Sequence, residues 1–152
     1  MDLSTPPANF LMSFNDITLP PGVVISDTTT HVAQIGSLRA YGFSNELIGM
    51  LQKKNFTDSA VTGSFTVQYL YSTKPFTITG SDTMASINET TINTYNASFV
   101  AGWNAYTLRV AEKRPGYTKY EIFTGEASGG TWYCTTTTID LFRKRNFKLN
   151  IN

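Results

Sequence analysis

Hydrophobic and polar residues alternate along much of this chain. Positions 65–71 carry Phe, Val, Tyr and Tyr at every second residue, and positions 147–151 carry Phe, Leu and Ile in the same way. Because successive side chains of a β-strand point to opposite faces of a sheet, this period of two predicts half-buried strands. Roughly nine such segments recur at spacings of about 8–12 residues. The pattern predicts an all-β fold, an antiparallel β-sandwich or barrel, with a jelly-roll arrangement among the options.

Turn residues between these segments suggest how the strands connect. Pro115-Gly116 is typical of a type II turn, since proline presets its backbone angle and glycine accepts a positive φ. Gly80–Asp82 is a second predicted turn. The segments Tyr117–Thr124 and Thr131–Phe142 are predicted to be antiparallel neighbours, joined by the loop Gly125–Gly130.

One short segment near 45–54 has the spacing of a helix instead. Ser44 is a suitable N-cap, and Lys53 and Lys54 suit a helix C-terminus. Apolar residues recur at the i, i+3, i+4 spacing, namely Leu47, Met50 and Leu51. We therefore expect one short helix in an otherwise all-β chain.

The chain of 152 residues has the length of one domain, and we expect residues 1–152 to form it. Residues 1–21 are predicted to be an extended N-terminal arm, because their four prolines cannot donate hydrogen bonds to a central strand. An apolar cluster in this arm provides the expected anchors onto a neighbouring subunit: Phe10, Leu11, Met12 and Phe14.

Composition narrows the class of protein further. Charged residues make up only 15% of the chain and the net charge is +1, whereas aromatic residues make up 13%. This excludes a coiled coil and a disordered chain, and a single cysteine, Cys134, excludes a disulfide scaffold. Thr, Ser and Asn are abundant, and Thr and aromatic residues favour strands.

Residue types that handle protons or bind metals are scarce. His31 is the one histidine, and no second His or Cys stands at metal-ligand spacing. We expect it to be an ordinary residue at the surface or at a strand end. Glu121 and Glu126 are the candidate paired carboxylates, but the sequence gives no reason for them to converge. We therefore expect a protein that is not an enzyme, with no catalytic residues, no cofactor and no bound metal.

Aromatic residues of the second half suggest a different use. Trp103, Trp132 and Tyr133 form a candidate platform for a glycan or small ligand, because exposed aromatic faces bury a large area at little entropic cost. The alternative is that these rings fill the core of the fold.

A cluster of basic residues lies near the C-terminus: Arg143, Lys144, Arg145 and Lys148. Four charges in a chain of net charge +1 are few for nucleic-acid binding, so we do not expect a nucleic-acid partner. Solubility and protection of an edge strand explain them better, and contact with the acidic N-terminal half of another copy is a third option.

These observations favour a structural or assembly subunit over an enzyme. The concrete form of this hypothesis is a bacteriophage virion component, a capsid decoration or tail protein, whose partners are other copies and neighbouring structural proteins. A carbohydrate- or small-ligand-binding module is the alternative. The sequence shows no signal peptide and no membrane span. We therefore expect location in a virion or extracellular assembly, or otherwise in the cytoplasm.

Overall fold

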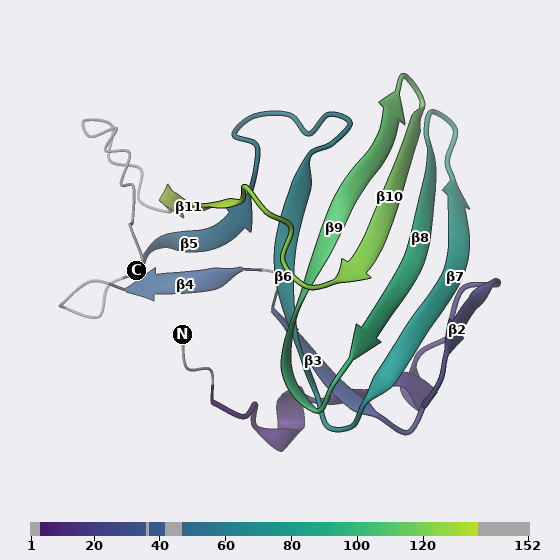
Figure 1. The fold of residues 1–152 in the computed structure, drawn as a ribbon, viewed down its shortest axis with the longest axis vertical. Coiled ribbons are helices and arrows are strands. Elements are labelled where there is room, and N and C mark those ends of the chain that lie inside the picture. Colours follow the sequence, from purple (N-terminus) through teal and green to yellow (C-terminus); the bar gives the residue numbers. More distant parts are fainter. Residues whose placement is uncertain (1–3, 36, 42–46, 137–152) are drawn as a thin grey trace.

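A computed structural model describes residues 4–35, 37–41 and 47–136, and these form an almost purely β structure. One mixed sheet curls into a half-barrel, which confirms the predicted all-β class (Figure 1). The described helical segments are two single 3-10 turns, η1 (Ala8–Phe10) and η2 (Phe14–Asp16). The described strands are β1 (Met12–Ser13), β2 (Val23–Ile25), β3 (His31–Ile35), β4 (Leu38–Tyr41), β5 (Leu47–Lys54), β6 (Phe65–Ser72), β7 (Phe76–Ala85), β8 (Thr90–Phe99), β9 (Gly102–Arg114), β10 (Tyr117–Thr124) and β11 (Thr131–Thr136).

The half-barrel has the strand order β1-β3-β6-β9-β10-β8-β7-β2. Neighbouring strands are antiparallel, with the exception of β8 and β10, which run parallel, so the prediction of an antiparallel sheet is corrected to a mixed one. Strands β4, β5 and β11 form a wing beside the half-barrel, in which β5 pairs with both neighbours and reaches β6 at Lys53 and Lys54.

The predicted pairing of Tyr117–Thr124 with Thr131–Phe142 is wrong. Both edges of β10 are occupied, one by β9 and the other by β8, so β11 pairs with β5 instead. The segment 125–130 consequently crosses the outer face of the sheet. Buried Thr107 of β9 fixes it there, since its hydroxyl donates to the Gly125 carbonyl (2.7 Å) and accepts from the Ala127 N–H (3.0 Å).

Of the two predicted turns, one is confirmed and the other is wrong. Pro115-Gly116 joins β9 to β10, and Gly116 has a φ of +70°. Gly80 lies inside β7, which runs on without turning. Its φ is +107°, which favours glycine, and the backbone at the start of β2 approaches closely, so that a Cβ at this position would lie 1.9 Å from the Gly22 carbonyl oxygen.

The helix predicted near 45–54 is also wrong, because residues 47–54 form strand β5. This segment pairs on one edge with β11 and on the other with β4, so ladder hydrogen bonds on two sides outweigh its helix propensity. Gly49 fits the strand, since a Cβ there would lie 2.5 Å from the Thr135 carbonyl oxygen. The proposed cap, Ser44, lies outside the described residues.

Alternate residues of the half-barrel point to its inner face and form the core. Phe76 lies at its centre, with ring centroids 5.1 Å from Phe14 and 4.8 Å from Phe99. Phe14 and Leu19 come from the N-terminal segment and pack against the inner face. The buried members of this cluster are Ile25, Val32, Phe76, Ala97, Phe99, Tyr106 and Ile122.

Candidate functional site

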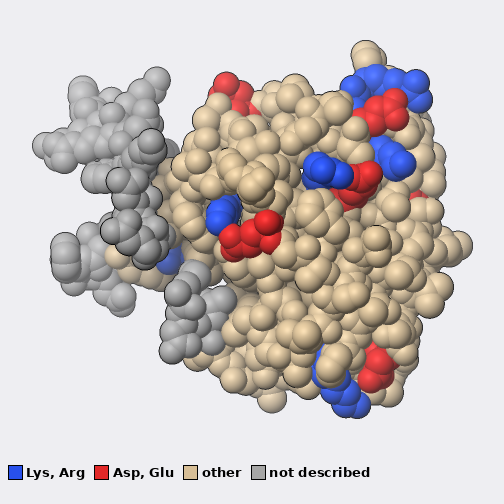
Figure 2. Space-filling model, in the orientation of Figure 1, with Lys and Arg blue, Asp and Glu red and all other residues tan. Residues whose placement is uncertain are grey.

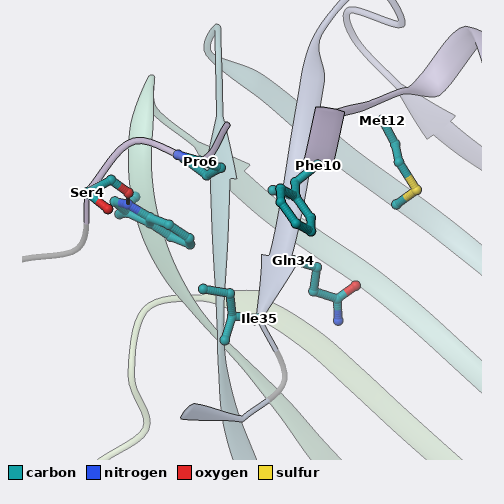
Figure 3. A pocket seen from close by; sticks show the side chains of 8 residues that line it. Ser4, Pro6, Phe10, Met12, Gln34 and Ile35 are labelled. Atoms are coloured by element: carbon teal, nitrogen blue, oxygen red, sulfur yellow. Dashed lines mark hydrogen bonds between the residues drawn. The ribbon is translucent and has the colours of Figure 1, made fainter. Parts of the chain in front are cut away.

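A cleft of about 630 Å³ opens between the N-terminal segment and strand β3 (Figure 3). We call it the arm cleft. None of its lining residues is charged, and most are apolar. They are Ser4, Pro6, Phe10, Met12, Ala33, Gln34, Ile35 and Trp103. Concave, mostly apolar sites with a few polar groups are typical of binding sites.

Few contacts hold residues 4–13 beside β3. Strand β1 pairs with β3 at two positions, Met12 with Val32 and Ser13 with His31. Before β1, the segment leaves the edge of β3 through turn η1 and reaches β9, where the Trp103 indole N–H donates to the Ser4 carbonyl (3.0 Å). The turn therefore separates the arm from the edge of β3.

The apolar side chains of the arm remain largely accessible at this cleft. Phe10 is 65% exposed and Met12 is 54% exposed, although both line it. Soluble proteins expose isolated apolar side chains routinely, but two of them at the rim of an apolar cleft form a surface suited to binding.

The polar end of the arm cleft is Gln34. Its side-chain N–H groups donate to the side-chain oxygen of Gln68 (Oε1) and to the Tyr106 hydroxyl, both at 2.6 Å. Burial raises the pKa of Tyr106 to about 12, although the hydrogen bond from Gln34 acts in the opposite direction, and the nearby Tyr95 adds to the rise. Since both amide hydrogens are used, the side-chain oxygen of Gln34 is left as an acceptor with no donor among the described residues.

The four residues predicted as arm anchors therefore separate into different environments. Phe10 and Met12 line the arm cleft, and Leu11 is the half-buried C-cap of η1. Phe14 packs into the core of the half-barrel against Phe76. The alternation pattern did not distinguish these positions, because the sequence does not reveal where turn η1 interrupts the strand.

The three residues of the predicted ligand platform also lie in different places. Trp103 lies at the arm cleft and meets Tyr71 edge-on at 5.5 Å, whereas Trp132 stacks on Tyr69 at 6.2 Å with the two rings nearly parallel. These four half-buried rings form an aromatic row on the outer face. Tyr133 is not part of it, since it lies beside the Lys54 ammonium on the opposite face of the wing.

Glu126 and Lys53 complete the end of the aromatic row near Trp132. The Glu126 carboxylate accepts from the Tyr69 hydroxyl (2.7 Å) and pairs with Lys53. The hydrogen bond from Lys53 lowers the pKa of Glu126, whereas burial and the Glu126 contact raise that of Tyr69. Sequence reasoning missed Tyr69, Tyr71 and this pair, although the period of two at 65–71 already placed the tyrosines on one face.

The other candidate residues show no convergent chemistry. His31 is exposed at the start of β3, as predicted, and Glu121 pairs with Arg109 on the outer face. Within the described ranges, no group of three or more His, Cys, Asp or Glu side chains could hold a metal ion. The basic cluster Arg143, Lys144, Arg145 and Lys148 lies outside the described residues. No described helix has the length and apolar character needed to cross a membrane.

Comparison of the chain with models of protein families, with curated proteins and with solved structures found no match.

Proposed function

We propose that this protein is a non-enzymatic assembly subunit that acts by adhesion through its arm cleft. The observation that carries the proposal is an uncharged cleft of about 630 Å³, with Phe10 and Met12 largely exposed at its rim. Covering these side chains would remove apolar area from water, which is the main favourable term in protein association.

The outer face of the half-barrel supports the same proposal. Charged side chains occupy a few separate groups in Figure 2, with a broad uncharged area between them. Between positions 77 and 81 of β7 and positions 94 and 98 of β8, the outward side chains are small and polar. They pair across the two strands: Thr77 with Ser98, Thr79 with Asn96, and Ser81 with Thr94. Such a face packs against protein without burying charge, which would be costly. A virion component, such as a capsid decoration or tail protein, is the concrete form of this proposal.

The mass of the full chain in solution tests the proposal. Sedimentation velocity over a concentration series from about 1 μM to 1 mM should show association with a dissociation constant within that range, as for small apolar interfaces. A strictly monomeric species at every concentration would contradict the proposal.

A second candidate function, binding of a glycan or small ligand, is favoured by the aromatic row. Neither indole of the row is buried, so Trp103 and Trp132 retain accessible surface, and Glu126 lies next to Tyr69 as a polar contact. A glycan panel monitored by tryptophan fluorescence tests it. Binding that Trp132→Ala removes, while Tyr133→Ala leaves it unchanged, would support the row as the platform. Equal loss in both variants, or no binding at all, would count against it.

A further inference from the structure

The edge of strand β3 that faces the arm cleft lacks a described pairing partner beyond Val32. The β1–β3 ladder consists of Met12 with Val32 and Ser13 with His31, and it ends there. On the opposite edge β6 pairs with β3 through to Ile35. Residues 33–35 of β3 therefore form an edge strand on this side, and such an edge is a template for strand addition.

The backbone of Gln34 points to this free edge. His31 directs both its N–H and its carbonyl toward Thr73, on the β6 side. Alternate residues of an antiparallel strand direct these groups to opposite edges, so Gln34 directs both of its groups into the arm cleft. Phe10 would be the next partner in register, but its N–H already donates to the Pro7 carbonyl within η1 (2.9 Å). The cleft thus offers a backbone donor and acceptor, and the free side-chain oxygen of Gln34 adds a second acceptor.

We propose that the arm cleft is an interface between two copies of this chain, in which the arm around Phe10 of each copy enters the cleft of the other. The inference deepens the proposed function, on which it rests, by naming the surface and the partner. Within the pair, a backbone carbonyl of the incoming arm accepts from the free Gln34 N–H while that arm keeps turn η1, and its apolar side chains lie between Phe10 and Trp103 of the receiving copy.

Two observations select a second copy as the occupant. The arm both forms one wall of the cleft and carries the exposed Phe10 and Met12, so a two-fold axis beside Phe10 would bring these side chains of each copy against the cleft of the other. In addition, residues 4–15 contain no charged side chain, which matches the uncharged lining. A charged segment would bury an unpaired charge in the cleft at considerable cost.

Light scattering coupled to size exclusion, applied to the full chain and three variants, tests this interface. Phe10→Ser removes the inserted side chain. Gln34→Pro removes the edge N–H and leaves the backbone ladder to β6 in place. It also removes the side-chain hydrogen bonds from Gln34 to Gln68 and Tyr106, so its unfolding midpoint is compared with that of Gln34→Ala. Ile87→Ser is the matched control, since Ile87 is fully exposed in the β7–β8 turn. We expect the first two variants to weaken dimerisation by at least about tenfold and the control to leave it unchanged. At a dilution where the wild type is monomeric, Phe10→Ser should have the same unfolding midpoint as the wild type, which shows that the variant is folded.

The possible results distinguish a failure of the proposed interface from a failure of the proposed function. If the wild type associates and all three variants associate equally well, the arm-cleft interface is wrong and assembly uses another surface. If the wild type stays monomeric, the proposed function and the interface are both overturned. If Ile87→Ser disrupts association as strongly as Phe10→Ser, the interface includes the opposite end of the half-barrel and the proposal is likewise wrong.

Discussion

The inner face of the half-barrel and the arm cleft are built from adjacent parts of the same N-terminal segment, yet they differ in packing. Phe14 and Leu19 close the inner face, where Phe14 lies against buried Phe76. Phe10, four residues earlier, is 65% exposed at a cleft that no described residue fills. The difference shows how one segment provides stability with its second half and an accessible apolar surface with its first half.

Truncating each phenylalanine tests this difference in packing with the largest expected effect. Phe14→Ala should lower the free energy of unfolding by about 3 kcal/mol, because it leaves a cavity against Phe76. Phe10→Ala should change it by less than about 0.5 kcal/mol, since exposed positions contribute little. Urea denaturation of dilute protein measures both values. Equal losses in the two variants would show that the arm and the core are one packed unit.

The second test concerns Tyr106, which links the inner face to the cleft through Gln34. Its folded-state pKa is raised to about 12 by burial, whereas an unfolded tyrosine titrates near pH 10. The unfolded state therefore loses its proton first, so stability is intact below pH 10 and falls as the pH rises to 12. The expected loss from this group is about 2 kcal/mol by pH 12. Between pH 9 and 12, the denaturation midpoint should fall less steeply with pH for Tyr106→Phe than for the wild type. Identical slopes in the two proteins would show that Tyr106 does not cause the pH dependence of stability.

A smaller effect is expected from Asp82, the buried acid of the inner face. Asp82 is 7% exposed, and one carboxylate oxygen has no hydrogen-bond partner among the described residues. Asp82→Asn should raise the free energy of unfolding by about 1 kcal/mol, because it removes a buried negative charge. It should also bring the pKa of Tyr95 closer to that of free tyrosine, since the Asp82 charge adds to the effect of burial there. A loss of stability would contradict this expectation and would mean that the hydrogen bond between Asp82 and Tyr95 outweighs the cost of burying the charge.

The alternation of hydrophobic and polar residues along the sequence correctly predicted where several strands lie and which of their side chains share a face. It placed Phe65 and Val67 on one buried face and identified β9 by its alternating Tyr106 and Val110. It could not predict strand order, because pairing of β8 with β10 is a contact between distant segments. The error at 47–54 has the same origin, since two neighbouring strands override the helical spacing of that segment.

The candidate site was predictable only in part. Phe10, Met12 and Trp103 were all identified from sequence, but as members of two separate sites, an arm and a platform. The structure brings them together because the arm folds back until Ser4 meets the Trp103 indole. Gln34 carried no signal in the sequence, since its importance comes from its place on a strand edge whose ladder ends early.

Hydrogen exchange of the Gln34 backbone amide tests the central claim most directly. If a second copy adds its arm to β3, this amide should exchange rapidly in dilute protein and slow by at least about tenfold at a concentration where the chain is mostly dimeric. The amide of Ala33, which β6 already pairs, should exchange at the same rate in both samples. A Gln34 amide that exchanges at the same rate in monomer and dimer would contradict the account.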